Sequence, residues 1–179
     1  MKNIVLMIVL ILLCCCENKN EEIRQNIEQL KSQPISLSLD KMRLYYKAVN
    51  NDRVEKDLKL IVYIDSTMCS SCYLKSIDRW YYLLDSLYAK SDNFEPIFIM
   101  SPKKTEVNAI KYKLDFLKFD YPIYLDSMGI FDGNNPHMPK ESMYHTFLLD
   151  KRNYVLFVGN PLNNTKISEK ILSILDETK

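Results

Sequence analysis

The feature that most constrains this chain is a buried strand that leads directly into a closely spaced pair of cysteines. The run LKLIVYI at residues 58–64 is almost entirely apolar and rich in β-branched side chains. Such a run is typical of a strand buried on both faces of a sheet. The motif CSSC, from Cys69 to Cys72, follows it and opens a segment with helical periodicity. We therefore expect the two thiols to lie where a buried strand passes into a helix.

The rest of the chain alternates between helical and strand-like patterns. We predict helices over residues 17–33, 72–90, 105–118 and 164–177, and strands over 35–39, 96–101, 121–126, 145–150 and 154–159. Pro34 ends the first helix, and the turn KRN joins the last two strands as a hairpin. Alternation of strands and helices implies parallel crossovers, and the hairpin adds an antiparallel strand. The expected fold class is α/β, with a mixed sheet and helices on both faces.

Composition and charge exclude several classes of function. With 179 residues, 47% of them apolar, the chain has the material for one domain with a packed core. The 24 basic and 23 acidic residues leave a net charge of +1, without a basic surface for nucleic acid or a polybasic run for an anionic membrane. Three glycines exclude the usual glycine-rich phosphate-binding loop. We expect no nucleic-acid partner and no cofactor.

The N-terminus carries a second group of cysteines. Lys2 is followed by an apolar run from Ile4 to Leu13 and then by three consecutive cysteines. The run is shorter than the ~20 residues that cross a bilayer and has the length of the apolar region of a secretory signal. This layout resembles a bacterial lipoprotein signal, in which a cysteine becomes the lipid-bearing N-terminus after cleavage. The resemblance implies a signal peptide over residues 1–15 and lipidation of Cys16, with Cys15 as the alternative. An uncleaved anchor and an ordinary signal also remain open.

The segment after the cysteines is polar and acidic. The residues ENKNEE resemble the stretch that marks surface export in some Bacteroidetes lipoproteins, although a soluble linker has the same composition. We expect residues 16–56 to form a tether and arm and residues 57–179 to form the folded domain. This domain would lie outside the cytoplasm, in the periplasm or on the outer-membrane surface, where disulfides persist. Cys69 and Cys72 are then its only cysteines.

A redox couple is the interpretation of CSSC that we favour. A thiol at a helix N-terminus meets unpaired backbone N–H groups, which lower its pKa from ~8.5 into the range of ~3.5–7.5. The nearest cation is Lys75, so we expect a moderate lowering. Cys69 would be the exposed attacking thiolate, and Cys72, one turn into the helix and more buried, would resolve the mixed disulfide.

Three other interpretations of CSSC compete. A zinc site needs further ligands, but His137 and His145 are eight residues apart rather than the usual three to five. A purely structural disulfide would close a very short loop and stabilise little. A peroxidatic cysteine is suggested by Ser66, three residues before Cys69, but the usual preceding proline is absent. We predict no metal site.

The order of strand, CxxC, helix, strand, helix and the hairpin HTFLLDKRNYVLFVGNP resembles the thioredoxin fold over residues 57–177. Within that fold it resembles the secreted TlpA-like branch and the Bacteroidetes lipoprotein redoxins. The resemblance implies a three-layer sandwich that exchanges disulfides with protein substrates and with a membrane redox partner. The alternative is a non-catalytic binding module of the same fold, in which the CSSC disulfide is static.

The chain departs from the thioredoxin pattern at two positions. Met68 stands where thioredoxins carry an aromatic residue before the first cysteine, and Tyr144 stands where they carry a cis-proline. Because a cis bond before a residue other than proline costs about 3 kcal/mol, we expect a trans bond at Tyr144. Pro139 lies too far upstream to replace the proline. We therefore expect substrate backbone to dock differently here.

Further candidate site residues come from the loops around this motif. The segment 126–144 is long for a compact domain, and such loops are more often functional than idle. Within it, His137 and Glu141 are candidate proton relays or substrate contacts, with solvated side chains as the alternative; Tyr144 is a candidate substrate contact. Asp65, four residues before Cys69, is a candidate buried acid–base group, or a strand-end carboxylate bonded to backbone.

Overall fold

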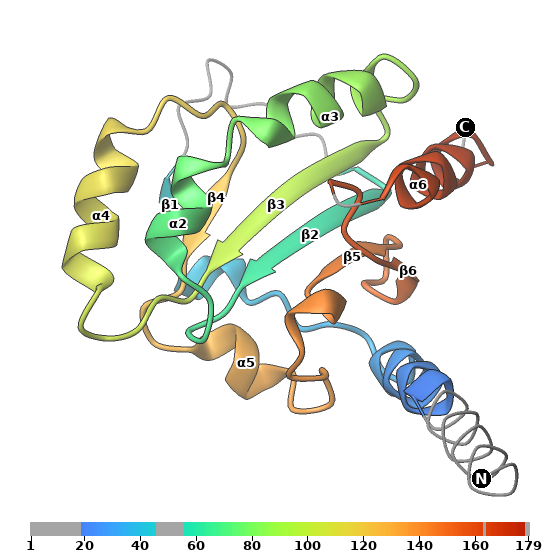
Figure 1. Cartoon of the computed structure of the whole chain (residues 1–179), viewed down its shortest axis with the longest axis horizontal. Helices are drawn as coiled ribbons and strands as arrows, with labels where there is room; N and C mark the ends of the chain where they lie inside the picture. Colours follow the sequence, from blue (N-terminus) through green and yellow to red (C-terminus); the bar gives the residue numbers. More distant parts are fainter. Residues whose placement is uncertain (1–18, 46–55, 163, 178–179) are drawn as a thin grey trace, which may run out of the picture.

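The computed structural model describes residues 19–45, 56–162 and 164–177. They form a six-stranded sheet in the order β1-β4-β3-β2-β5-β6 with helices on both faces (Figure 1). The strands are β1 (Arg43–Tyr45), β2 (Leu58–Ile64), β3 (Phe94–Met100), β4 (Ile123–Leu125), β5 (Thr146–Leu149) and β6 (Val155–Val158). The predicted α/β class with a mixed sheet is confirmed.

The central strand is β2, which explains its unbroken apolar sequence. It pairs in parallel with β3 and antiparallel with β5, and all seven of its residues are buried. β4 pairs in parallel with β3, and β1 pairs antiparallel with β4 at the outer edge. β5 and β6 form the predicted hairpin. Its turn is shaped by Asp150, whose Oδ1 accepts bonds from the backbone N–H groups of Arg152 at 2.9 Å and Tyr154 at 2.8 Å.

Two apolar layers cover the two faces of the sheet. The helical elements are a helix over residues 19–31, η1 (Leu39–Lys41), α2 (Ser70–Lys75), α3 (Arg79–Tyr88), α4 (Val107–Phe116), α5 (Ile130–Asn134), η2 (Ser142–Tyr144) and α6 (Thr165–Glu177). On one face α2, α3, α4 and α6 pack against Leu60 and Val62 of β2. On the other, the helix over 19–31, α5 and η2 pack against Ile61 and Tyr63. Alternate residues of one strand therefore serve opposite layers.

The predicted helix over 72–90 is in fact two helices. α2 ends at Lys75, and α3 begins at Arg79. At the break, the Ser76 hydroxyl donates to the carbonyl of Tyr73 at 3.1 Å, and the Trp80 N–H donates to Ile77 at 2.9 Å, three residues back rather than four. Serine side chains compete for helix carbonyls in this way, so the helical ladder is interrupted here.

The predicted strand over 35–39 is wrong. The N–H of Ile35 donates to the carbonyl of Asn153 at 2.9 Å, and that of Ser36 donates to the Asn135 side chain at 2.8 Å. These residues therefore dock onto loops, and the strand in this part of the chain is β1. The segment 126–144 contains α5 and η2 rather than loop alone.

The N-terminal arm, where described, is part of the same packed body. Leu30 is 0% exposed and Ile35 is 1% exposed, and both lie in the apolar layer under α5 and η2. The predicted boundary between residues 56 and 57 borders a stretch, 46–55, outside the described residues. Within the described residues, no helix combines the length and the apolar character that crossing a membrane requires.

Candidate redox site at the CSSC motif

The two cysteines of CSSC are joined by a disulfide at the start of α2. Their Cα atoms lie 5.2 Å apart. Cys69 is the N-cap of α2, and its Sγ accepts a hydrogen bond from the backbone N–H of Cys72 at 3.2 Å. The predicted passage from buried strand to helix is confirmed, because β2 ends at Ile64 and α2 begins at Ser70. The sulfur of Cys69 thus accepts a bond from one of the N–H groups of the first helical turn, which have no backbone partner within the helix.

Burial does not separate the two thiols in the way we predicted. Cys69 and Cys72 are both exposed, and Ser70 is the buried residue of the motif, at 0% exposure. The prediction of a buried Cys72 is therefore wrong. Ser70 and Leu74 are four residues apart and share the inward face of α2. Cys72 lies two residues from each, which turns it about 200° away on a helix of 3.6 residues per turn.

The loop before Cys69 is shaped by the carboxylate of Asp65. Its Oδ1 accepts three bonds: from the N–H of Thr67 at 2.7 Å, from the Thr67 hydroxyl at 2.7 Å and from the N–H of Met68 at 3.0 Å. Asp65 follows β2 directly and is 9% exposed. It is thus a strand-end carboxylate bonded to backbone, as one of our two interpretations held. It positions the residues that lead into Cys69, and its acid–base role stays a prediction.

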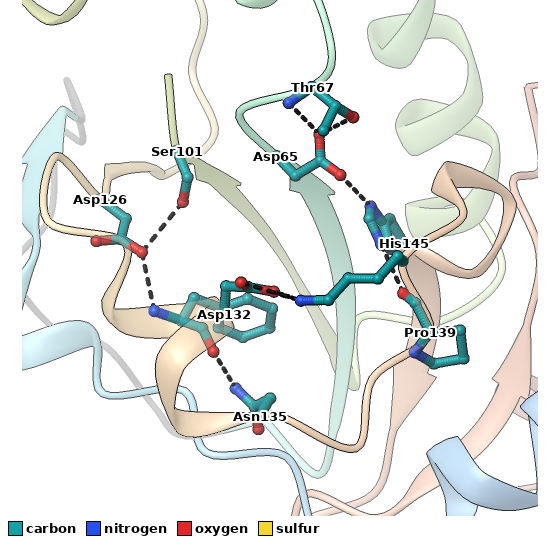
Figure 2. Close-up of polar contacts among 10 residues, drawn as sticks. Asp65, Thr67, Ser101, Asp126, Asp132, Asn135, Pro139 and His145 are labelled. Carbon is teal, nitrogen blue, oxygen red and sulfur yellow. Dashed lines mark hydrogen bonds and ion pairs between the residues drawn. The ribbon is translucent and has the colours of Figure 1, made fainter. Parts of the chain in front are cut away.

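His145 contacts the other oxygen of the same carboxylate (Figure 2). Its Nδ1 lies 3.4 Å from Oδ2 of Asp65, and its Nε2 lies 3.0 Å from the carbonyl oxygen of Pro139. The side chain of His145 is 3% exposed and that of Asp65 is 13% exposed. Sequence reasoning considered His145 only as a zinc ligand. The available signal was its place directly before β5, because the start of β5 lies opposite the end of β2, with Thr146 facing Val62.

Tyr144 occupies the position of the expected proline and has a trans peptide bond, as do all described residues. Its side chain is 3% exposed and lies in the apolar layer with Phe131 and Phe147. Its hydroxyl accepts a bond from Nδ2 of Asn26 at 3.4 Å. A substrate contact by Tyr144 would therefore involve its backbone, and it stays a prediction.

The two loop candidates lie in different surroundings. Glu141 is exposed and precedes η2 without a capping hydrogen bond from its side chain. His137 is half-buried, and its Nε2 has no hydrogen-bond partner among the described residues. Burial lowers the pKa of His137 below its usual 6.5. Their predicted roles as relays or substrate contacts stay predictions. Among the described residues, no three His, Cys, Asp or Glu side chains are grouped so that they could hold a metal ion.

A polar cleft of about 440 Å³ adjoins the CSSC loop at the carboxyl ends of β2, β3 and β4. Its walls include Thr67, Lys103 and Met128. The floor is organised by Asp126, which is 1% exposed and accepts bonds from Ser101 Oγ and from the first N–H groups of α5. Sequence reasoning missed Asp126, because it placed that residue at the end of a predicted strand.

Burial also changes the pKa of a tyrosine that lines this cleft. It raises the pKa of the Tyr63 phenol to about 12, mainly because the charged form would lose its hydration. Lys140 and Asp132 both line the cleft, and Lys140 Nζ forms an ion pair with Asp132 at 2.9 Å. The cleft therefore combines neutral hydroxyls, the Asp132–Lys140 ion pair and the exposed Lys103 and Lys104 next to the loop over residues 65–67.

Comparison with solved structures decides the fold. A thioredoxin-like protein determined in solution in its oxidised form is 18% identical to this chain, with 84% of this chain and 98% of that chain covered at a TM-score of 0.52. The chain has the thioredoxin fold. The three-layer arrangement that we expected from the resemblance is thereby confirmed.

Other thioredoxin-fold structures align less closely. A thioredoxin-like protein of Bacteroides caccae is 15% identical, over 89% of this chain and 55% of that chain, with a TM-score of 0.49. A protein of Chlorobium tepidum described as the thiol:disulfide interchange protein DsbE is 17% identical, over 68% of this chain and 82% of that chain, with a TM-score of 0.47. No family model matches the chain, and no curated protein sequence matches it significantly.

Proposed function

We propose that this protein is an extracytoplasmic thiol–disulfide oxidoreductase that exchanges disulfides with protein substrates. The observation that carries the proposal is the exposed disulfide between Cys69 and Cys72 at the first turn of α2, directly after the central strand of a thioredoxin fold. Both cysteines are exposed, and a disulfide between exposed residues is accessible to an attacking thiolate.

Cys69 is the residue that attacks in the reducing direction. Its sulfur accepts the Cys72 N–H at the helix N-cap, and such a bond stabilises the thiolate over the thiol. The Cys69 thiolate attacks one sulfur of a substrate disulfide and releases the other as a thiolate. Cys72 then attacks Cys69 in the mixed disulfide, which reforms the internal disulfide and releases the reduced substrate. A membrane redox partner returns the pair to the dithiol.

Trapping of mixed disulfides tests this function. In Cys72→Ala the first step proceeds and the second cannot, so substrate proteins should accumulate on Cys69. The matched variant Cys69→Ala controls for exposure, because Cys72 is also exposed. We expect many more adducts with Cys72→Ala than with Cys69→Ala. Equal adducts on both would refute the assignment of Cys69, and adducts on neither would identify a static disulfide in a binding module.

The lipid anchor and the location belong to the same proposal. Residues 1–15 would be removed as a signal, Cys16 would carry the lipid, and residues 16–56 would join it to the domain over residues 57–179. These cysteines lie outside the described residues. Labelling with a lipid precursor in a bacterial host should mark the wild-type chain and Cys15→Ser, but not Cys16→Ser. Label on the wild type and Cys16→Ser but not on Cys15→Ser would assign Cys15, and label on none of them would refute the anchor.

A further inference from the structure

Asp65 has two effects on the redox site, and they conflict. Its Oδ1 accepts three hydrogen bonds that shape the loop up to Met68, the residue before Cys69. The carboxylate lies 3.0 Å from the backbone nitrogen of Met68, one residue before Cys69, and a negative charge there opposes the formation of a thiolate at Cys69 because like charges disfavour each other. The loop therefore needs the Asp65 oxygen as a hydrogen-bond acceptor, whereas a thiolate at Cys69 is disfavoured by the negative charge of the same side chain.

The surroundings of His145 indicate how the conflict is resolved. Its Nε2 meets the carbonyl oxygen of Pro139 at 3.0 Å, and a carbonyl can only accept, so Nε2 carries a hydrogen. Its Nδ1 is buried, has no aligned hydrogen bond among the described residues and lies 3.4 Å from Oδ2 of Asp65. In a neutral ring, the lone pair of Nδ1 would face this carboxylate. Protonation of Nδ1 replaces that repulsion with an ion pair.

We propose that His145 is a positioning residue that carries a proton on both ring nitrogens and neutralises Asp65, so that Asp65 can shape the CSSC loop without opposing a Cys69 thiolate. This inference rests on the proposed exchange function for its biological purpose, although the charge effect itself requires only that the thiols can be reduced. It assigns no contact with substrate to either residue.

The other ionisable groups near Asp65 are paired or neutral side chains, apart from Lys103 and Lys104, which line the same cleft and are exposed. The Tyr63 ring lies 5.1 Å from that of His145 and stays protonated. Asp132 is paired with Lys140 at 2.9 Å. Asp126 accepts bonds from Ser101 and the start of α5. His137 is half-buried, and burial lowers its pKa, which favours the neutral ring. Among the described residues, His145 is the basic side chain that lies within ion-pair distance of Asp65, at 3.4 Å.

Two substitutions separate the charge effect from the effect on loop shape. In Asp65→Asn, the amide oxygen still accepts from Thr67 and Met68, and the amide N–H can donate to Nδ1 of a neutral His145. In His145→Gln, the amide N–H can still donate to the Pro139 carbonyl, but Asp65 loses its cation. A loss of loop structure would slow the reaction of Cys69 in both variants, whereas the charge effect slows it only in His145→Gln.

The measurement is the rate of alkylation of Cys69 by iodoacetamide across a pH series, in fully reduced protein carrying Cys72→Ala. At pH 7 we expect His145→Gln to react about three- to tenfold more slowly than the parent, the effect of a nearby uncompensated charge worth about half to one pKa unit. Asp65→Asn should react at the parental rate or faster. Asp57→Asn is the control, because this exposed carboxylate pairs with Lys151 before the start of β2, at the opposite end of that strand from Cys69.

Nitrogen NMR of the His145 ring supplies a readout that does not depend on the variants. In the wild-type oxidised protein at pH 7, both ring nitrogens should give the signals of an imidazolium. A neutral ring, or a shift of both variants in the same direction, would overturn the inference. Neither measurement uses a protein substrate, so a failure of substrate trapping would refute the proposed function and leave this test intact.

Discussion

The indole Nε1 of Trp80 donates a hydrogen bond of 2.7 Å to the hydroxyl of Tyr73. Tyr73 belongs to α2 and Trp80 to α3, so this bond crosses the break between the two helices. Trp80 is 0% exposed and packs edge-on against Phe98 of β3. Besides the packing of Leu74 in the core, this bond therefore links the short helix that carries the disulfide to the central sheet.

Tyr73→Phe should destabilise the protein by about 1–3 kcal/mol, because it leaves a buried indole N–H without a partner. The free energy of unfolding from urea titration measures the effect. Tyr82→Phe is the matched control: Tyr82 lies on α3 at 81% exposure and should change the stability little. Equal stability of Tyr73→Phe and the parent would show that the bond does not fasten α2.

Asn135→Ala should detach the N-terminal arm from α5. The Asn135 side chain is 0% exposed, accepts the N–H of Ser36 at 2.8 Å and donates to the carbonyls of Ser36 at 3.0 Å and Phe131 at 2.7 Å. Loss of these bonds should cost about 2–4 kcal/mol and speed proteolysis of the arm. Asn134→Ala is the control, since its exposed bond to Ser38 should contribute little. Unchanged cleavage of the arm in Asn135→Ala would contradict this prediction.

Asp126→Ala should cost about 3 kcal/mol or more, because it removes a buried acceptor of two α5 N–H groups and of the Ser101 hydroxyl. Asp132→Asn, on the same helix, breaks only the exposed ion pair with Lys140 and should cost less than about 1 kcal/mol. Urea unfolding of the two variants gives the comparison. Equal losses would show that Asp126 does not organise the start of α5.

His137 should make the fold less stable in mild acid. Burial lowers the pKa of His137 in the folded state, so the unfolded chain binds its proton more readily. Stability then rises with pH wherever the unfolded state holds more protons, and it falls as pH drops below the unfolded value of about 6.5. Between pH 7.5 and 5, the wild type should lose more unfolding free energy than His137→Gln. Parallel curves for the two proteins would exclude this contribution.

The central strand and the hairpin could be predicted because their signals are local. Every residue of β2 is buried, so its sequence is apolar without alternation, and the turn of the hairpin lies between two such runs. The placement of CSSC followed from the same reasoning. The break between α2 and α3 could not be predicted, because it depends on which carbonyl the Ser76 hydroxyl bonds.

The partners of the redox site were harder to predict than its thiols. The burial of Ser70 in place of Cys72 follows from the angle at which α2 meets the sheet, and helical periodicity does not fix that angle. The contact between Asp65 and His145 joins residues far apart in the chain. It depends on the register of β5 against β2, so no local sequence pattern predicts it.

The helix over residues 19–31 would affect how the domain is oriented on the proposed lipid anchor. Its first residues are exposed, and its burial increases toward Leu30, which is fixed in the core. Thirteen helical residues span ~20 Å at 1.5 Å per residue. Only residues 17 and 18 separate Cys16 from this helix, so a lipid at Cys16 would hold the domain through a helix that packs on the sheet. The disulfide would then face a restricted range of directions above the bilayer, so that geometry, as well as chemistry, would select which proteins reach it.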